Sequence, residues 1–457
     1  MCVVRPAVAL WLVLLVLASG RAQPAFREDS TLLRLLRREH LSRPLPPVEA
    51  TRAARAESLW ALELEPWRKT SGFTGMFSRE DVQRARRTVR NHAWARKELR
   101  LIRQDADFWA RFSDAFLYAL LPTQNPRALT PSQYHGCPIH GGNRTTLETS
   151  LEHPYRYRCR VGGEWWYDGA RVVNPTTGDT VVVHDDGSGW VAPEGFANPG
   201  ESYYFKGAYR LYLILKLFSH PYGPEIHDTY RGLPPVQALA FAYALTGQSR
   251  YAHKAGVLLN RIAQLYPHFD GLKEGYAAYD RWKAPIRGYV GEASGREQGF
   301  LNSVALVYDL IFDAFSRDDS LAAFFAARGF PDLDGDGRVT PADLTLNVEH
   351  NLFGFALEFI DRTIPIAPGD FLMSTHSSLI HMAGCLPSPK LRQRLFEGPN
   401  NLPLLMSNSF FRDGKWWYDS IGYSLHNSEH IAELAEWLNR FELYTSEGPV
   451  RQIVSFP

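Results

Sequence analysis

An acidic loop carries the most specific chemical pattern in the sequence, Asp332-Leu-Asp-Gly-Asp-Gly-Arg-Val-Thr-Pro-Ala-Asp343. Carboxylates at loop positions one, three, five and twelve, with glycine at position six for the sharp turn, match the calcium loop of an EF-hand. The pattern predicts a structural calcium clip, and the alternative interpretation is an acidic turn between helices. The residues assigned to the ion are Asp332, Asp334, Asp336, Arg338, Thr340 and Asp343.

Aromatic residues and histidines cluster further along the chain, in Trp416-Trp-Tyr-Asp-Ser-Ile-Gly-Tyr423 with His426 and His430 after it. A tyrosine just ahead of a helix, beside a glycine, could extend its hydroxyl to a substrate at the rim of a cavity. The alternative is an aromatic patch of the core. Tyr423 is therefore a candidate for acid–base chemistry.

Two histidines, His376 and His381, stand five residues apart upstream of that cluster. Two histidines on one helix chelate a metal best when they are four residues apart, because they then share a face. The spacing therefore argues against a metal site at this pair.

A polar loop, Glu225-Ile-His-Asp-Thr-Tyr-Arg-Gly232, lies immediately before a predicted helix. Helix N-termini favour anions, and Arg231 could hold a carboxylate through two hydrogen bonds. The alternative is a structural arginine in an ion pair. Sugar rings could stack on nearby aromatic faces. The aromatic candidates are Trp165, Trp166, Trp190, Tyr203, Tyr204, Phe205 and Trp282.

The N-terminus has the pattern of a secretory signal peptide over residues 1–22. Arg5 precedes the apolar run Ala7–Leu17, and small residues follow at Ala18, Ser19 and Gly20. A permanent anchor is the alternative, but a membrane span needs about 20 apolar residues and the run is shorter. We expect a periplasmic or secreted protein with no membrane association after cleavage.

Export makes the cysteines Cys137, Cys159 and Cys385 interpretable. An oxidising compartment permits one disulfide, and Cys137 with Cys159 is the best-placed pair because the two flank a loop-rich stretch. The competing interpretation is zinc. Cys137-Pro-Ile-His140 has ligand-like spacing, but Cys159 has no obvious second partner, which leaves three ligands.

Three segments together resemble the heparinase II/III-like polysaccharide lyases and their alginate-lyase relatives. They are Tyr-Arg-Gly before Pro-x-Gln-Ala-Leu-Ala-x-Ala-Tyr-x-Leu-Thr-Gly (230–247), a Tyr-Pro helix end at 266–267, and Asp-Gly-x-Trp-x-x-x-Ser-x-x-Tyr (413–423). The resemblance spans roughly residues 60–445. It implies an α/α toroid followed by a β-sandwich, acting on uronic-acid polysaccharides. The family's Asn-His pair has its closest match in Thr375-His376.

β-Elimination requires a neutralised uronate carboxylate, a base for the C5 proton and an acid for the leaving oxygen. We assign Tyr423 as proton donor or base, and His376 as base or carboxylate partner. Arg231 and His227 would bind the carboxylate, and Tyr230 would line the cleft. An adjacent cation would lower the pKa of the tyrosine from about 10. The reaction requires no metal at the cleft.

Two rival functions use other residues. An inverting glycoside hydrolase needs two carboxylic acids about 6.5–9.5 Å apart, for which Glu297, Asp280 and Asp419 are the candidates. A non-catalytic glycan-binding protein would use the aromatic faces and the calcium loop.

The composition excludes further classes. The chain of 457 residues has 50 Lys and Arg against 49 Asp and Glu, a formal net charge of +1, and is 45% hydrophobic. Nucleic-acid binders and polybasic membrane-surface proteins need a basic surplus, which is absent from this composition. The expected partner is an acidic polysaccharide substrate.

Helical periodicity dominates on both sides of a different middle segment. Residues 23–121 form the expected N-terminal helical region, residues 122–205 a loop and short-strand insert with a hairpin turning at Thr177–Asp179, and residues 206–457 a toroid. We therefore predict an all-α fold, either a bundle or a complete or incomplete α/α toroid. The uncapped apolar end at residues 451–457 is interpreted as a truncation or as the start of a missing β-sandwich. The predicted helices are Thr31–Arg38, Glu49–Leu64, Ser78–Gln104, Asp105–Leu121, Leu233–Thr246, Ala252–Tyr266, Glu297–Phe315, Leu344–Ile360, His376–Cys385, Pro389–Phe396, Leu402–Phe411 and Ser424–Tyr444.

Overall fold

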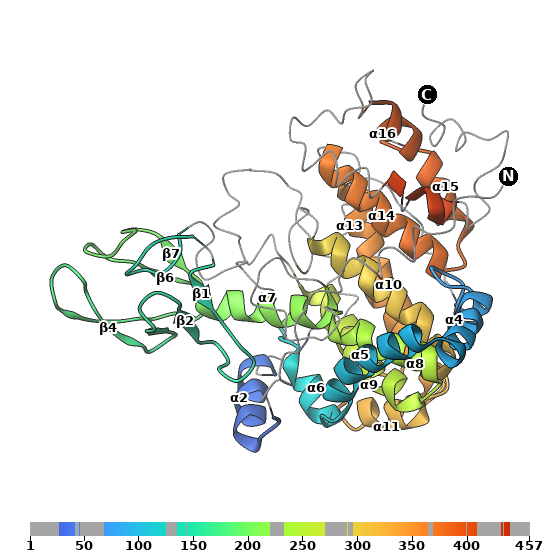
Figure 1. The fold of residues 1–457 in the computed structure, drawn as a ribbon, viewed down its shortest axis with the longest axis horizontal. Coiled ribbons are helices and arrows are strands. Elements are labelled where there is room, and N and C mark those ends of the chain that lie inside the picture. The colour runs from blue at the N-terminus through green and yellow to red at the C-terminus, as the bar shows by residue number, and fades with distance from the viewer. Residues whose placement is uncertain are drawn as a thin grey trace.

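A computed structural model gives the architecture as mainly α-helical. It describes residues 27–41, 45, 68–124, 135–143, 145–219, 233–269, 290, 296–363, 369–398, 400–408, 431–432 and 434–438. Within these residues the strands are two or three residues long and all lie between Leu147 and Tyr203. Figure 1 shows them gathered to one side of the helices. The predicted mainly-α class is confirmed.

Helices at the N-terminal side begin where polar side chains cap them. Asp29 accepts a hydrogen bond from the Leu32 N–H at 2.6 Å, and Ser78 forms a capping box with Asp81. Each cap satisfies backbone N–H groups that have no partner inside the helix. The helices are α2 (Ser30–His40), α4 (Arg79–Asn91), α5 (Ala93–Ala110) and α6 (Asp114–Leu120).

Two of the predicted helix boundaries in this region are wrong. The predicted helix Ser78–Gln104 is broken at His92, which adopts an extended conformation with φ −121° and ψ 131°. No boundary exists at Asp105, since α5 continues to Ala110. The next helix starts instead at Asp114, after Ser113, whose side chain accepts from the Phe116 N–H and acts as an N-cap.

The insert, residues 122–205, contains small antiparallel sheets. The predicted hairpin is confirmed, because Val173 pairs with Thr180 across a turn in which Gly178 has φ 78°. Strands this short are not stable alone, so side-chain packing must hold the sheets together. The strands are β1 (Leu147–Glu148), β2 (Tyr157–Cys159), β3 (Trp165–Trp166), β4 (Arg171–Val173), β5 (Thr180–Val182), β6 (Trp190–Val191) and β7 (Ser202–Tyr203).

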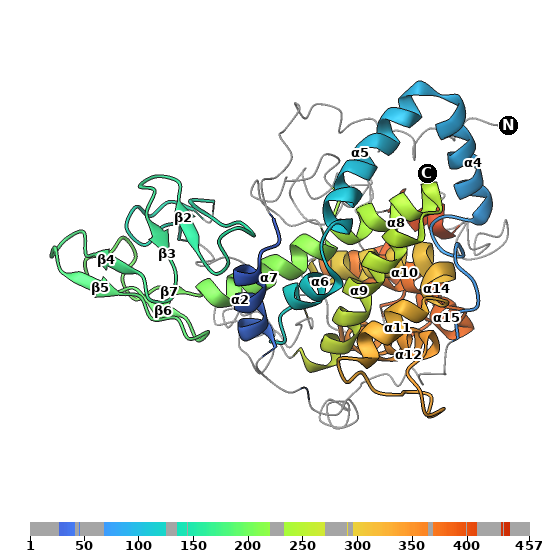
Figure 2. The ribbon, with the colours of Figure 1, turned by 90° about the horizontal axis from the view of Figure 1, so that it is seen from below.

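Helices from α7 onward form the helical body. Figure 2 shows α7 leading from the insert into this body, where α8, α9, α10 and α14 lie close together. Gly247 ends α8 in a left-handed conformation with φ 74°, which allows α9 to begin two residues later. The helices are α7 (Phe205–Phe218), α8 (Pro235–Thr246), α9 (Ser249–Leu265), the 3₁₀ turn η2 (Tyr266–His268), α10 (Arg296–Phe315), α11 (Asp319–Ala326), α12 (Pro341–Leu346), the π-helical segment η4 (Asn347–Phe353), α13 (Gly354–Thr363), α14 (Gly369–Cys385), α15 (Pro389–Phe396) and α16 (Leu402–Asn408).

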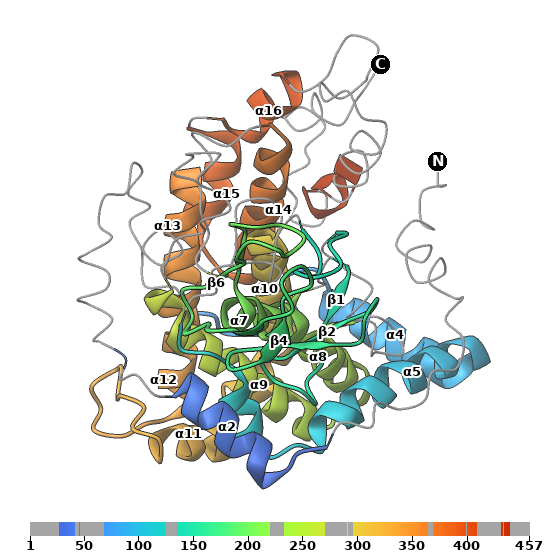
Figure 3. The same cartoon turned by 90° about the vertical axis from the view of Figure 1, so that its left-hand side faces the viewer.

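Packing within the helical body centres on α10, which contacts α8, α9 and α14. Figure 3 shows α13 and α14 rising from this centre toward α16. Fully buried apolar side chains fill the interfaces, among them Leu239 of α8, Leu258 of α9, Val304 of α10 and Ile380 of α14. Burying such side chains contributes about 1.5–3 kcal/mol each, so these contacts fix the relative positions of α10 and α14.

Two helices of the body were not among those predicted, and one is irregular. Helix α7 is almost continuously buried, so its sequence lacks the alternation of faces that reveals a surface helix. Helix α11 is short and apolar. The predicted helix Leu344–Ile360 exists as α12, η4 and α13 in succession, with the π-helical segment in the middle.

Other predictions fall wholly or partly outside the described residues. The signal peptide at residues 1–22, the helix Glu49–Leu64 and the end at residues 451–457 lie there. Of the predicted helix Ser424–Tyr444, residues 431–432 and 434–438 are described, and they are helical.

Among the described helices, no single one is long and apolar enough to cross a membrane. One pair, Glu297–Phe315 with Asp319–Ala326, passes the length and composition test together, bent by 106° at the break.

Candidate functional site

Of the five candidate catalytic residues, the structure places one, His376. It is fully buried on α14. Arg231, His227, Tyr230 and Tyr423 lie outside the described residues. Among the described residues, His376 is therefore the one that represents the predicted catalytic site.

The turn of α14 that carries His376 is bonded to α10 by polar side chains. Thr375 Oγ1 accepts from Gln298 Nε2 at 3.3 Å, and Ser378 Oγ donates to Asn302 Oδ1 at 2.9 Å. Asn302 Nδ2 in turn donates to Ser377 Oγ at 3.0 Å. We call this set, Gln298, Asn302, Thr375, Ser377 and Ser378, the polar seam.

The polar seam is buried although its members are uncharged polar groups. Thr375, Ser377, Ser378 and Gln298 are each at most 2% exposed, and Asn302 is half-buried. Burying such groups is unfavourable unless they are hydrogen-bonded, as they are here. The mutual bonds fix the position and rotation of the turn and hold His376 in place.

The second histidine of α14 makes different contacts. The His381 ring lies 4.3 Å from the Trp437 ring, centroid to centroid, and its Nδ1 is 2.8 Å from the Ser377 carbonyl oxygen. His381 thus lies on the same helix as His376 and packs against Trp437, which makes it a useful comparison for His376.

The acidic loop brings three of its predicted ligands together. Carboxylate oxygens of Asp332, Asp334 and Asp343 all lie within 4.8 Å of one another, and Asp336 is not in that group. Asp332 accepts from the Gly335 N–H and the Gly337 N–H, both at 2.7 Å, which curls the loop around its carboxylate. These two bonds lower the pKa of Asp332.

The position-twelve residue of the loop, Asp343, lies in the first turn of the following helix, α12. Asp343 is fully buried and accepts from the Leu333 N–H at 2.6 Å and the Thr340 N–H at 2.7 Å. Thr340 is the N-cap of α12, and its side chain accepts from the Ala342 N–H. Arg338 donates its N–H to Asp336 at 2.9 Å. The loop is thus closed from both ends onto Asp343.

The cysteines of the insert are not joined, contrary to the expected disulfide. Cys137, Cys159 and Cys385 are free. The His140 ring lies close to both Cys137 and Cys159, with its Nδ1 3.6 Å from Cys137 Sγ and 3.5 Å from Cys159 Sγ. The two sulfurs and the ring nitrogen therefore lie in one cluster, within 4.8 Å of one another.

Glu164 is the fourth member of this cluster, and it was not predicted from the sequence. Its Oε1 lies 2.9 Å from Cys137 Sγ and 2.9 Å from His140 Nδ1. One ligand atom from each of Cys137, His140, Cys159 and Glu164 lies within 4.8 Å of every other. The available signal was Gly162-Gly163 before Glu164, because adjacent glycines permit a tight turn back to Cys159.

The aromatic residues expected to stack on sugars are instead core residues wherever they can be placed, except Trp165. Trp166, Tyr203 and Phe205 are fully buried, and Trp190 and Tyr204 are less than one-tenth exposed. The rings of Trp166 and Phe205 stack 6.2 Å apart, and Trp190 packs on Tyr203 at 5.9 Å. Trp165 is half-buried, and Trp282 lies outside the described residues. Packing between short strands, rather than ligand contact, explains these aromatics.

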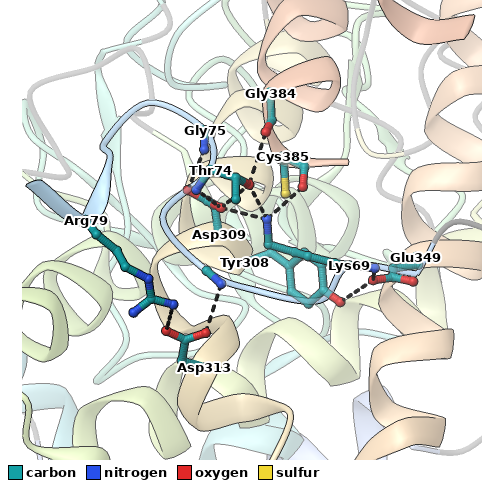
Figure 4. A network of polar contacts seen from close by, with 11 residues as sticks. Lys69, Thr74, Gly75, Arg79, Tyr308, Asp309, Asp313, Glu349, Gly384 and Cys385 are labelled. Carbon is teal, nitrogen blue, oxygen red and sulfur yellow. Dashed lines mark hydrogen bonds and ion pairs between the residues drawn. The ribbon is translucent and has the colours of Figure 1, made fainter. Parts of the chain in front are cut away.

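A buried ionic network anchors the segment before α4 to the helical body. Figure 4 shows Lys69 pointing between Asp309 of α10 and the carbonyl end of α14. Lys69 Nζ donates to Asp309 Oδ1 and to the Cys385 carbonyl, both at 2.7 Å. The Tyr308 hydroxyl donates to Glu349 at 2.7 Å, and burial raises the pKa of Glu349. Every partner is internal, so the network is structural.

Glu297 is the one candidate acid of the rival hydrolase that lies among the described residues. Glu297 is fully buried and accepts from the Tyr266 hydroxyl and the Val290 N–H. Asp280 and Asp419 lie outside the described residues.

No protein-family model matches the sequence, and no curated protein or solved structure matches it significantly.

Proposed function

We propose that the chain is a secreted polysaccharide lyase that cleaves a uronic-acid-containing polysaccharide by β-elimination. The supporting structural observation is the polar seam, which holds the turn carrying His376 in one buried position between α10 and α14. Catalytic groups perform best when their own surroundings lock them in place. The motif resemblance at residues 230–247 and 413–423 supplies the reaction class.

The proposed chemistry divides among the five assigned residues. Arg231 and His227 bind the uronate carboxylate, which makes the C5 proton more acidic. His376 or Tyr423 removes that proton, and Tyr423 protonates the leaving glycosidic oxygen. Tyr230 lines the cleft. The fold we propose is an α/α toroid, with the contacts of α10 with α8, α9 and α14 as part of its wall.

The products distinguish this function from its rivals. A lyase creates an unsaturated uronate that absorbs at about 232 nm, whereas a hydrolase releases reducing ends without that band. We would incubate the purified protein with heparin-like, alginate, hyaluronate and chondroitin-like polymers and follow both signals. Ultraviolet absorbance on any polymer supports the proposal. Reducing ends without absorbance would favour the hydrolase over the lyase. If neither signal appears, a glycan-binding protein is favoured.

We also propose that the loop at residues 332–343 binds one calcium ion with a structural role. The support is the convergence of Asp332, Asp334 and Asp343, together with the turn bonds at Gly335 and Gly337 that shape the loop. Oxygen ligands of this kind suit a hard cation such as Ca²⁺. The ion would clamp the loop between α11 and α12.

A further inference from the structure

The cluster in the insert is built from two turns of the same design. In the first, the Ile139 N–H points at Cys137 Sγ at 3.4 Å. In the second, the Val161 and Gly162 N–H groups point at Cys159 Sγ, each at 3.4 Å. Backbone N–H groups directed at a sulfur stabilise a thiolate, the form in which cysteine binds metals.

The second turn has no ligand at the third residue after its cysteine, where the first turn has His140. Glu164 supplies the missing ligand. His140 follows Cys137 by three residues, but the residue three after Cys159 is Gly162. A Cβ at position 162 would overlap Glu164 Oε2 and the His140 ring. The glycine therefore leaves room for the Glu164 carboxylate to reach the same point from two residues further on.

The ligand atoms are spaced almost as a tetrahedral zinc ion requires. Zinc bonds of about 2.3 Å to sulfur and about 2.0–2.1 Å to nitrogen or oxygen place neighbouring ligands about 3.3–3.8 Å apart. His140 Nδ1 lies 3.6 Å and 3.5 Å from the two sulfurs. Glu164 Oε1 lies 2.9 Å from both Cys137 Sγ and His140 Nδ1, which is closer than two zinc ligands lie. Zinc binding would therefore move Oε1 away from these atoms by a few tenths of an ångström.

The donor types and their burial select among metals. Two thiolates with an imidazole and a carboxylate suit zinc and are poor ligands for Ca²⁺ or Mg²⁺. Both cysteines are buried, whereas His140 and Glu164 have side chains 32% and 23% exposed, so one side of the cluster is open to entering metal. Four protein ligands leave no open position, as in structural zinc sites.

We propose that Cys137, His140, Cys159 and Glu164 bind one zinc ion that fastens the insert. The insert needs such a fastening because its strands are too short to be stable alone. The first turn is also bonded to the β6–β7 side, where the Ala197 N–H donates to the Pro138 carbonyl at 2.8 Å. Zinc thus joins β2 and the first turn, and through them the neighbouring sheets.

Metal analysis of the purified protein tests the site directly. We expect one zinc per chain by elemental mass spectrometry. The absorption spectrum of the cobalt-substituted protein should show thiolate charge-transfer bands and the d–d bands of tetrahedral cobalt. Cys159→Ala and His140→Ala should lose the ion. Cys385→Ala, which removes a thiol outside the cluster, and Glu152→Gln, which removes an exposed carboxylate of the insert, should keep it.

The fourth ligand has a graded test. Glu164→Gln should weaken zinc binding by at least about tenfold in competition with a chromogenic chelator. Removing zinc should speed amide hydrogen exchange across β1–β7 and leave α8–α10 unchanged. A protein that binds no zinc when zinc is supplied, or that contains a Cys137–Cys159 disulfide, would overturn the proposal. So would wild-type affinity in Glu164→Gln.

Discussion

Lys69 Nζ lies 2.7 Å from Asp309 Oδ1, and both side chains are only 2% exposed. The pair joins the segment before α4 to the middle of α10, and Asp309 also accepts from the Thr74 and Gly75 N–H groups. A buried pair of this kind is costly to break, because the remaining charge has no solvent to stabilise it.

Replacing Lys69 by methionine should therefore lower the free energy of unfolding by about 3–5 kcal/mol, measured by urea denaturation. Arg79→Met is the matched control. Arg79 pairs with Asp313 at 2.7 Å, but its side chain is 57% exposed, so its loss should cost at most about 1 kcal/mol. Equal losses in the two variants would contradict the assignment of Lys69 as a buried anchor.

His253 should make stability fall as the pH rises above neutrality. Hydrogen bonds to Asp114 and then Asp318 raise its pKa from 6.5 to about 9, against the effect of burial. Because the folded state holds the proton more tightly, this contribution is complete below about pH 6.5 and disappears as the pH passes through 9. Allowing for screening at this half-buried site, we expect about 1–3 kcal/mol.

The measurement is the difference in free energy of unfolding between the wild type and His253→Gln, followed from about pH 5.5 to about pH 9.5. This range extends beyond both the unfolded pKa of 6.5 and the folded pKa of about 9. His184→Gln, which changes an exposed histidine of the insert, should show no such pH-dependent difference. A difference that grows with pH would reverse the predicted sign.

Calcium should stabilise the protein through the loop at residues 332–343. At calcium concentrations about 100 times the dissociation constant, binding adds about 2.7 kcal/mol to the folded state. We expect a calcium-dependent rise in melting temperature that a chelator reverses and that Asp332→Ala abolishes. Asp319→Asn, an exposed acid at the start of α11, should retain the rise. A rise that survives Asp332→Ala would place the ion elsewhere.

Gly162→Ala should weaken the proposed zinc site without any change of ligand. The added methyl group would overlap Glu164 and His140, so we expect the affinity for zinc to fall by at least about tenfold. In Gly299→Ala the new Cβ would meet only Ser219 Cβ, at 4.0 Å, and zinc binding should be unchanged. Unchanged affinity in Gly162→Ala would show that Glu164 is not a ligand.

His376→Asn should lower kcat by about 10²–10⁴-fold, the usual contribution of a positioned acid or base. His381→Asn is the control on the same helix, since His381 packs on Trp437. It should reduce stability more than turnover. Comparable losses of kcat in both variants, with both proteins folded, would mean that His376 acts only through packing.

Local patterns in the sequence predicted local structure well. The helix start at Ser78, where the structure has a capping box, and the hairpin around Gly178 were both predicted, because each depends on residues within a few positions of one another. The predicted helix Pro389–Phe396 matches α15 at both ends. The break at His92 was not foreseen, and no side-chain cap marks it.

Contacts between distant segments were the harder part. Glu164 was missed because nothing in the spacing after Cys159 identifies a carboxylate as the replacement for a second cysteine or histidine. Trp166 and Trp190 were assigned to sugar stacking because composition does not distinguish an aromatic core from an aromatic surface. The polar seam depends on α10 meeting α14 across more than seventy residues of sequence.

The most direct test of the proposed lyase is absorbance at about 232 nm during incubation of wild type, Tyr423→Phe and Tyr418→Phe with the most reactive uronate polymer. Tyr418 is a tyrosine of the same segment without an assigned role. The proposal predicts absorbance with wild type and Tyr418→Phe and a loss of at least about 10²-fold in Tyr423→Phe. Full activity in Tyr423→Phe would contradict it.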